Sequence, residues 1–314
     1  MDLIHCEELE AYKFMHKIGW DLFSHPHSIV EDIVKKWLNA HNIQFQRGNK
    51  SIIKSFELDF YIAEKRTAIE VNDTSSHNST RHFKSDKPKS KNYHLNKTIA
   101  CKKKRIHLIH IFEKDLDKLD IVLHPLLPKK VIGASKLKLK DNMHLLNFYA
   151  ENNRQGAGNA SKGLCLVDKT GNILVAMTIT KSRYKSKAEY ELYRYCVASG
   201  WNVKFGFERL FKNYLKILDL KEGDRIISYC DRTYNQCKVY TKNGFKYSHS
   251  SEPNYKWVKG LNWLSRESCQ RHKLAKRFNK EKYQNKTWTE KTIMENEGYL
   301  RVYDCGNKVF MYQV

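Results

Sequence analysis

Proline and glycine are scarce in this chain, and its apolar runs are short. Five prolines and 14 glycines among 314 residues, with no tract rich in glycine and serine, argue against a long flexible linker. The most apolar stretches, such as residues 106–112 and 121–127, are far shorter than the roughly 20 residues that a membrane helix needs. The N-terminal sequence MDLIHCEELEAYKF is acidic and has no apolar signal core, so we expect a cytoplasmic protein.

Cysteine is too rare for a disulfide scaffold. The eight cysteines include no C-x-x-C pair of the kind that indicates a structural zinc site. Cys230 and Cys237 have six residues between them, and Cys196, Cys269 and Cys305 are scattered. We therefore expect reduced thiols and no structural zinc.

Acidic residues are outnumbered by basic ones. The chain has 34 Asp and Glu against 57 Lys and Arg, which gives a net charge of +23 and a pI near 9.5. A hydrophobic content of 41% is enough for real cores, and the length favours two domains. A basic, aromatic-rich chain of this kind is typical of proteins that bind polyanions. Nucleic acid is the expected partner, and an acidic membrane surface is the alternative.

Hydrophobic spacing predicts a series of helices and strands in the first 130 residues. The predicted elements are a helix over 28–40, strands over 41–52, 55–62 and 67–71, a basic helix from residue 91, a strand over 106–112 and a helix over 115–123. The turn at Lys65-Arg66 joins two of these strands into a hairpin or a meander. This order of elements is typical of a mixed-sheet α/β unit.

The stretch 123–136 carries two of the five prolines and marks the expected domain boundary. After it, we predict a hairpin over 163–180, a strand over 190–197, a helix over 207–218, a strand over 225–230, a helical segment over 234–243, an extended segment over 245–255, a basic helix over 265–282 and a closing hairpin over 299–312. We therefore expect domains at 1–130 and 140–314, the second of them α+β.

Two carboxylates lie inside the apolar strands of the first half. Asp59 stands in ELDFYI and Glu70 in AIEVN, on either side of the predicted turn. Carboxylates are rarely buried unless they are paired or bind a metal, and Mg²⁺ prefers oxygen ligands. Such a metal activates water and stabilises the charge that develops on a phosphodiester. We expect a metal site here, and the alternative is a pair of ordinary solvent-facing strand charges.

The motifs of residues 28–113 resemble the core of PD-(D/E)xK nucleases. They are SIVEDIV, ELDFYIAEKRTAIEVN, His77 and KNYHLNKTIACKKKRIHLIHIFEKD. The resemblance is to the branch related to very-short-patch-repair endonucleases, which is found in free-standing phage homing endonucleases. It covers about the first 130 residues, and it implies a restriction-endonuclease-like mixed-sheet core that cuts DNA with Mg²⁺ or another divalent cation.

The resemblance implies a role for each matching residue. Asp59 would be the central metal ligand, and Glu70 would be the second acidic residue and a metal ligand. His77 would be the general base, because a histidine titrates near neutral pH. Glu31 matches the helical glutamate of that branch. Lys97 lies on the basic helix, where a polar or charged group often completes the site.

Two features depart from the family pattern. Asn72 replaces the lysine of the usual E-x-K triplet, and the loop 72–76 lacks the glycine and aromatics that precede the histidine in the related nucleases. His77 is then either the base or a solvated loop histidine, with His94 as a competing candidate. Glu31 is also placed to be the capping-box partner of Ser28.

Basic residues near the site and in the second half are expected to contact DNA. The segment 265–278, followed by ENEGYLRVYDCGNKVF, also resembles the C-terminal part of those phage endonucleases. Trp257, Trp263 and Trp288 are expected to pack in a core. The residues expected at DNA are His94, Lys102, Lys103, Lys104, Arg105, Arg266, Arg271, Lys273, Lys276 and Arg277.

Residues 205–245 resemble the later part of a GNAT-like acyltransferase fold. A helix is followed by a strand, a short helix with Tyr240 and a strand after Gly244-Phe245. The glycine-rich loop 154–159 precedes the first hairpin, whereas acyl-CoA binding needs such a loop between a strand and a helix. We therefore expect this domain to bind the DNA target, with an acyl-CoA transferase as an alternative.

Together these patterns predict a Mg²⁺-dependent endonuclease of double-stranded DNA, with homing of a phage element as its setting and no membrane or protein partner. Three alternatives remain open: a repair or structure-selective nuclease of the same core, a catalytically inactive DNA-binding protein, and the acyl-CoA transferase. Asn72 and the altered loop 72–76 favour the catalytically inactive protein.

Overall fold

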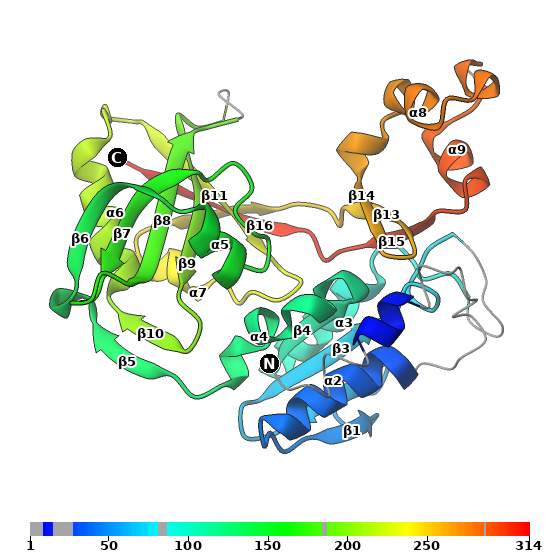
Figure 1. The fold of residues 1–314 in the computed structure, drawn as a ribbon, viewed down its shortest axis with the longest axis horizontal. Coiled ribbons are helices and arrows are strands. Elements are labelled where there is room, and N and C mark those ends of the chain that lie inside the picture. The colour runs from blue at the N-terminus through cyan, green and yellow to red at the C-terminus, as the bar shows by residue number, and fades with distance from the viewer. Residues whose placement is uncertain (1–8, 15–27, 81–86, 184–186, 286) are drawn as a thin grey trace. The chain divides into compact units, whose positions relative to one another are not determined.

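The computed structural model describes residues 9–14, 28–80, 87–183, 187–285 and 287–314, which form a mixed α/β structure (Figure 1). Residues 81–86, at the start of the basic segment, and residues 1–8, on which the expectation about a signal peptide partly rests, lie outside this description. Within the described part of the chain, no helix combines the length and the apolar character needed to cross a membrane.

The chain forms two compact units. The first unit comprises Met1–Asp117, Arg232–Tyr234 and Glu252–Gly306, and the second unit comprises Lys118–Asp231, Asn235–Ser251 and Asn307–Val314. The expected division at residues 130–140 differs from this in two ways. The chain leaves the first unit at Asp117, and it returns to that unit for Glu252–Gly306. Sequence patterns show local elements, whereas this return is decided by contacts between distant segments.

A four-stranded sheet forms the centre of the first unit. Its strands are β1 (Gln46–Asn49), β2 (Leu58–Ile62), β3 (Thr67–Asn72) and β4 (His107–Phe112), in that spatial order. The first three are antiparallel, and β3 and β4 are parallel. Parallel neighbours need a crossover, which here contains α3 (Tyr93–Lys103). The predicted hairpin, basic helix and apolar strand are confirmed.

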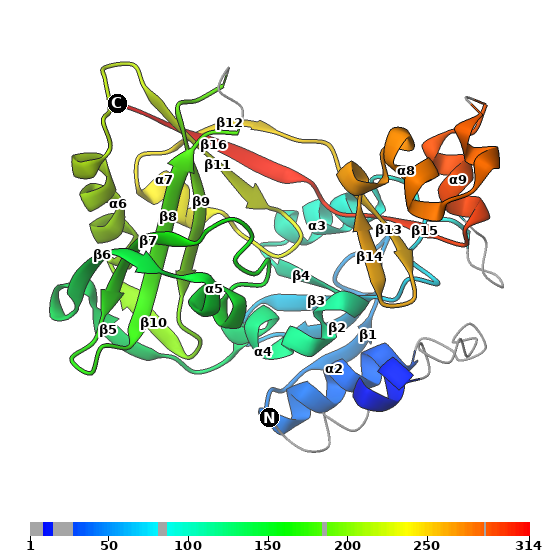
Figure 2. The ribbon, with the colours of Figure 1, turned by 45° about the horizontal axis from the view of Figure 1, so that its top comes forward.

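Two helices cover this sheet. Helix α2 (Ser28–Ala40) has the predicted bounds and buries Ile33, Val34 and Trp37. Figure 2 shows α2 on one side of the sheet and α3 on the other. Every residue of β3 is accordingly buried, whereas β2 alternates between buried and half-buried positions. The strand that carries Glu70 is therefore enclosed on both faces.

The helix predicted over 115–123 is broken into shorter pieces. A 3-10 helix, η2 (Glu113–Lys118), is followed by the one-turn helix α4 (Leu119–Val122). Asp115 Oδ2 accepts a hydrogen bond from Phe112 N at 3.0 Å, which ties this first turn to the end of β4. Aspartate side chains compete in this way with regular helical hydrogen bonding.

A second, three-stranded sheet in the first unit comes from Glu252–Gly306. It contains β13 (Tyr255–Lys259), β14 (Asn262–Ser265) and β15 (Leu300–Tyr303), in the order β14-β13-β15. The basic helix predicted over 265–282 is instead η5 (Arg266–Cys269), α8 (Arg271–Phe278) and η6 (Glu281–Gln284). The backbone leaves helical geometry at Gln270 and again at Asn279, which has a φ of +48°. Helix α9 (Glu290–Asn296) follows and begins with a capping box at Thr289.

The segment Glu252–Gly306 has its own hydrophobic core. Trp257 is fully buried there with Leu274, Tyr283 and Ile293, and the half-buried Trp288 packs against them. The expectation that Trp257 and Trp288 build a core is confirmed. Trp263 is half-buried and packs on a separate cluster with Phe112 of β4.

The closing hairpin predicted over 299–312 is wrong. β15 pairs with β13, whereas β16 (Asn307–Gln313) pairs with β11 (Arg225–Asp231) and β12 (Lys246–Ser250) in the second unit. Asp304 Oδ1 accepts hydrogen bonds from Asn254 N and Gly306 N, both at 2.7 Å. The turn is therefore tied to the segment before β13, and it carries the chain from one sheet to the other.

A seven-stranded sheet forms the second unit. Its remaining strands are β6 (Lys138–His144), β7 (Lys162–Val167), β8 (Ile173–Lys181) and β9 (Tyr190–Val197), and the spatial order is β12-β16-β11-β9-β8-β7-β6. Neighbours are antiparallel except for the parallel pair β9 and β11. The predicted hairpin of β7 and β8 and the predicted strands β9 and β11 are confirmed.

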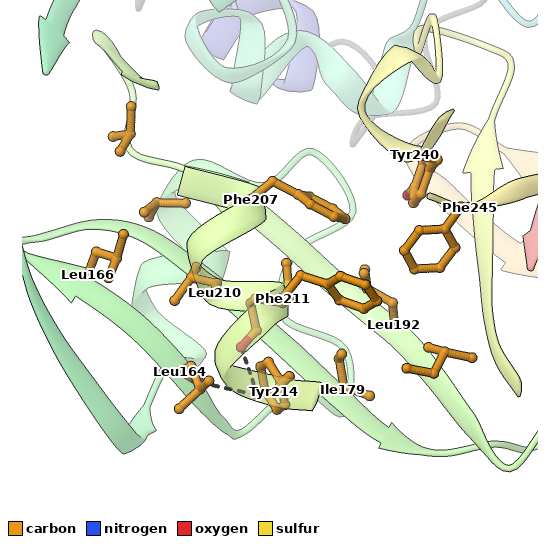
Figure 3. Close-up of a cluster of buried hydrophobic side chains, with 14 of the residues drawn as sticks. Leu164, Leu166, Ile179, Leu192, Phe207, Leu210, Phe211, Tyr214, Tyr240 and Phe245 are labelled. Carbon is orange, nitrogen blue, oxygen red and sulfur yellow. Dashed lines mark hydrogen bonds between the residues drawn. The ribbon is translucent and has the colours of Figure 1, made fainter. Parts of the chain in front are cut away.

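Helix α6 (Gly206–Ile217) supplies much of the core of the second unit. Phe207, Leu210 and Phe211 pack with side chains from β7, β8 and β9 (Figure 3). Tyr214 Oη donates to Met177 O at 3.0 Å and accepts from Leu164 N at 3.2 Å. A strongly amphipathic sequence thus becomes a helix whose apolar face lies on the sheet.

Several short elements of the second unit have no counterpart in the sequence-based prediction. They are the parallel pair β5 (Lys130–Gly133) and β10 (Trp201–Lys204), the strand β6 and the helix α5 (Leu146–Asn152). The helix predicted over 234–243 is reduced to α7 (Lys238–Lys242). β5 and β10 have four residues each, too few to show a period.

The expectation that all thiols are reduced is wrong at one place. Cys230 and Cys237 form a disulfide, with their Cα atoms 5.9 Å apart. Cys230 lies at the end of β11, and Cys237 has a left-handed backbone with φ +62°, which turns the chain back toward the strand. The other described cysteines are buried and are not disulfide-bonded: Cys101, Cys165, Cys196, Cys269 and Cys305.

Candidate active site

Asp59 and Glu70 stand opposite each other on β2 and β3. The antiparallel register pairs Phe60 with Ile69, so the residue before Phe60 faces the residue after Ile69. Asp59 Oδ2 also accepts a hydrogen bond from Val71 N at 2.7 Å. The two carboxyls lie close enough that the Asp59 charge contributes to the raised pKa of Glu70. The structure therefore brings together the two carboxyls on which the sequence argument depends.

Burial disfavours the state in which both carboxyls of this pair are negatively charged. Burial raises the pKa of Asp59 to about 6, although the Lys97 charge and the Val71 amide act in the opposite direction. The pKa of Glu70, which is 2% exposed, is raised well above its ordinary value by burial first and by the Asp59 charge second. A nearby cation relieves both effects.

Lys97 supplies a cation beside this pair. It lies on α3, and its ammonium donates to Glu70 Oε2 in a buried ion pair. Asn72, at the position of the expected triplet lysine, is 1% exposed, and its amide donates to Glu70 O and Ile111 O at 3.2 Å each. Asn72 therefore links β3 to β4, while the positive charge beside Glu70 comes from the neighbouring helix.

Glu31 is held at the edge of the pair by Arg47. Arg47 Nη2 donates to Glu31 Oε2 at 2.7 Å. The Glu31 charge makes a smaller contribution to the raised pKa of Asp59, which places it within electrostatic range. Sequence reasoning missed Arg47, because an arginine on the short strand β1 carries no motif. The side chain of Ser28, the proposed capping partner of Glu31, lies outside the described residues.

His77 and His94 form a buried pair. His77 Nδ1 lies 3.1 Å from His94 Nε2, and the rings are stacked with centroids 5.3 Å apart. The expectation that His94 lies on the helix surface near a phosphate is wrong, because the side chain is 1% exposed and its Nδ1 donates to Tyr303 O at 2.7 Å. Packing against β15, which sequence spacing does not show, encloses this part of α3.

Both histidines are neutral at pH 7. Burial is the main cause that lowers the pKa of His94 to about 4 and that of His77 well below its ordinary value. The Lys97 charge contributes to both shifts, so the histidine pair lies within electrostatic range of the Lys97–Glu70 ion pair. A neutral imidazole retains the lone pair that a general base needs.

The loop before His77 is built by side-chain hydrogen bonds. Asp73 Oδ1 accepts from Ser76 N at 2.9 Å, and the Asn78 amide donates to Ser75 O at 2.6 Å. Thr74 donates to the Glu113 carboxyl through its N at 2.9 Å and its Oγ1 at 2.5 Å. This loop has no glycine, yet it is closed and tied to the end of β4.

The oxygen donors of the site fit a hard divalent cation. Among the residues that the structure describes, no three or more His, Cys, Asp and Glu side chains form a group that could hold a metal. Mg²⁺ usually takes one or two carboxylates, and water and substrate phosphates complete its shell. Asp59 and Glu70 are such a pair, and burial, the main cause of their raised pKa values, disfavours a negative charge that a cation would offset.

The basic residues expected at DNA divide into two sets. Lys102, Lys103, Lys104 and Arg105 are all exposed where α3 ends. Three residues of the second set hold backbone carbonyls: Arg271 donates to Trp288 O and Gln284 O, Lys273 to Glu267 O and Arg277 to Ser268 O. Arg266 and Lys276 are exposed. The structure thus gives Arg271, Lys273 and Arg277 a bracing role within Glu252–Gly306.

The buried histidines predict a loss of stability in acid. The pKa of His94 is about 4 in the fold and about 6.5 in an unfolded chain, so protonation favours unfolding. The contribution of neutral His94 to the free energy of unfolding is therefore complete above pH 6.5 and falls by about 3 kcal/mol as the pH drops to 4. Denaturant unfolding of wild type and His94→Gln at pH 7 and 4.5 measures this contribution.

The comparison with wild type is needed because Asp59 has the opposite effect on the free energy of unfolding. Its pKa is raised in the fold, so its contribution to stability increases as the pH falls over the same range. We expect His94→Gln to lose less stability than wild type between the two pH values. Equal losses in the two proteins would contradict the prediction.

The site therefore combines a carboxylate pair, a buried lysine and a neutral histidine pair, which come from one sheet, the loop after β3 and the crossover helix. Comparisons with known proteins returned no match to a family model, a curated protein or a solved structure.

Proposed function

We propose that this protein is a metal-dependent endonuclease of double-stranded DNA. The observation that carries the proposal is the Asp59–Glu70 carboxyl pair with Lys97 ion-paired to it. Buried carboxylates beside a lysine are costly to the fold, and strongly perturbed groups of this kind gather at functional sites. The resemblance of residues 28–113 to PD-(D/E)xK nucleases assigns the same residues independently of the geometry.

Each side chain has a task in phosphodiester hydrolysis. A divalent cation held by Asp59 and Glu70 would supply an activated water and offset charge on the phosphate. Lys97 keeps Glu70 oriented through their ion pair and adds positive charge at a place where negative charge builds up. His77, which is neutral at pH 7, accepts a proton from water.

Affinity for DNA comes in this proposal from the exposed basic residues. Lys102 and Lys103 lie in the last turn of the helix that carries Lys97, and Lys104 and Arg105 follow it. Contacts of this type bind phosphates of any sequence, so they position the duplex and do not select a site. Sequence preference then requires contacts to base edges, for which we propose the exposed Arg266 and Lys276 of the C-terminal module, Glu252–Gly306.

For the second unit we propose a GNAT-like fold. Helix α6, strand β11, helix α7 with Tyr240, and strand β12 after Gly244-Phe245 follow in the order that this resemblance requires. The glycine-rich loop 154–159 lies between α5 and β7, that is, before a strand. This position does not favour acyl-CoA binding, so we propose a role in binding the DNA target for this unit.

The test is cleavage of long duplex DNA, including the genome of a host phage, with Mg²⁺ and with EDTA. Cutting that requires Mg²⁺ and stops with EDTA supports the endonuclease. Tight, salt-sensitive binding without cutting supports the inactive DNA-binding protein. Cutting only of mismatched, nicked or branched duplexes supports the repair or structure-selective nuclease.

Salt dependence tests the basic surface at the end of α3. We expect the triple substitution of Lys102, Lys103 and Lys104 by Gln to make the slope of log K against log salt shallower by about 2 to 3, because each phosphate contact releases about one counterion. Fluorescence anisotropy with a labelled duplex measures the slope. The triple Lys212→Gln, Lys216→Gln and Lys221→Gln removes the same charge from exposed positions of the second unit, so it reports separately the DNA contact that we propose for that unit. A slope that stays at the wild-type value in the first triple would contradict the phosphate contact at the end of α3.

A further inference from the structure

Strand β15 reaches the histidine pair from the far end of the chain. Tyr303 O lies 2.7 Å from His94 Nδ1, and His94 Nε2 lies 3.1 Å from His77 Nδ1. The carbonyl and the two rings therefore form a series of two hydrogen bonds. The first of them spans 209 positions of sequence.

The chemistry of the carbonyl assigns the protons in this series. A carbonyl oxygen only accepts, so His94 Nδ1 must carry the proton of the first hydrogen bond. A neutral imidazole has one N–H, so His94 Nε2 is an acceptor, and His77 Nδ1 must donate to it. His77 is neutral as well, so its Nε2 is unprotonated.

The same edge of β15 holds the loop that carries His77. Ser79 N donates to Arg301 O at 2.8 Å, Arg301 N donates to Thr80 Oγ1 at 3.1 Å, and Arg301 Nε donates to Ser79 Oγ at 3.1 Å. Alternate residues of a strand direct their backbone groups to the same edge, so Arg301 and Tyr303 both face away from β13. One strand edge thus positions His94 directly and His77 through its loop.

We propose that the Tyr303 carbonyl and His94 are positioning groups that hold His77 in the Nδ1–H tautomer and leave Nε2 as its proton acceptor. This inference rests on the proposed endonuclease function, since the tautomer matters to a reaction only if His77 takes a proton. A base in the wrong tautomer presents an N–H where a lone pair is needed. The C-terminal module then has a second role besides the proposed DNA contacts, because its strand β15 positions the histidine pair beside the four-stranded sheet.

The tautomers are measured directly. Two-bond ¹H–¹⁵N correlation spectra of the full chain, labelled with ¹⁵N-histidine and free of metal and DNA, report which ring nitrogen carries the proton. Spectra of His77→Gln and His94→Gln assign the signals. We expect the proton on Nδ1 in both rings at neutral pH, and a His77 ring with its proton on Nε2 overturns the proposal.

Two variants of His94 separate positioning from packing. In His94→Asn the shorter amide replaces Nδ1 at Tyr303 and does not reach His77, whereas the longer amide of His94→Gln places an oxygen near the position of Nε2. We expect His94→Asn to lose the Nδ1–H preference of His77 and to lower kcat by about 10²-fold with little change in KM. His94→Gln should keep the Nδ1–H tautomer of His77 and have a kcat about tenfold higher than that of His94→Asn. An equal loss in both variants, with the His77 tautomer unchanged, would mean that His94 only packs.

The two proposals fail separately. If wild type shows both Nδ1–H tautomers and cuts no DNA, the endonuclease proposal fails and the hydrogen-bond series stands. If wild type cuts DNA and His77 carries its proton on Nε2, the positioning proposal fails and the endonuclease stands. The tautomer of His77 is determined from the wild-type spectrum. The proposal is therefore tested even if a His94 variant does not fold.

Discussion

Asp59→Asn is expected to lower Mg²⁺-dependent cleavage by about three orders of magnitude or more while the protein remains folded. The amide is neutral, so it is a poor ligand for a hard cation. It has the same shape as the carboxyl and still accepts from Val71 N, so the hairpin keeps its hydrogen bond. Because burial raises the pKa of Asp59 to about 6, removal of its charge at pH 7 does not weaken the fold.

The measurement is single-turnover cleavage of one duplex, with its Kd determined in Ca²⁺ for both proteins. We expect the Kd of Asp59→Asn to be unchanged or lower, since a negative charge is removed from the proposed DNA-binding site. Glu64→Gln is the matched control, because Glu64 is exposed in the turn of the same hairpin. If Asp59→Asn cleaves like wild type, Asp59 is not a metal ligand.

Lys97→Met is expected to affect both stability and activity. Lys97 and Glu70 are 3% and 2% exposed as side chains, so the substitution leaves a buried carboxyl without its cation. Removal of one partner from a buried ion pair costs about 3 kcal/mol of unfolding free energy. Cleavage should fall by about 10²-fold, because the positive charge beside the proposed phosphate site is lost. Denaturant unfolding and cleavage of the same preparation measure the two effects.

A double variant tells the two roles of Lys97 apart. In Glu70→Leu with Lys97→Met, both charges are replaced by apolar groups of similar size, which is often neutral for stability. We expect the double variant to regain most of the lost stability and none of the activity. Lys102→Met, an exposed position on the same helix, should change the unfolding free energy by less than about 0.5 kcal/mol. A stable Lys97→Met protein would contradict the buried ion pair.

The sequence alone was sufficient to locate the carboxyl pair. Asp59 and Glu70 lie in apolar strands joined by a short turn, and antiparallel pairing leaves few registers for such a hairpin. The helix over 28–40 and the apolar strand β4 were likewise predictable, because the helix shows a helical hydrophobic period and the strand is a nearly continuous apolar run. The crossover helix was also predicted, but its buried residues are His94, Lys97 and Cys101, which no apolar period marks. Local pattern and local structure agree wherever an element is long and regular.

Contacts between distant residues decided the rest of the site. The position of His94 depends on β15, more than 200 residues along the chain. The partner of Glu31 is an arginine on a strand of four residues, and the charge beside Glu70 comes from a helix. The crossing of the chain at Asp304–Asn307 separates two strands that look like a hairpin.

The physical reason is the range over which each signal acts. Periodicity, capping and turn chemistry act over a few residues, so composition and spacing determined the basic character of this protein, its main helices and strands, and its acidic pair. The tautomer of His77 and the return of Glu252–Gly306 to the first unit depend on hydrogen bonds and packing across the whole chain. Only the tertiary structure decided them, because a backbone carbonyl such as that of Tyr303 is the same in every residue and leaves no mark in the sequence.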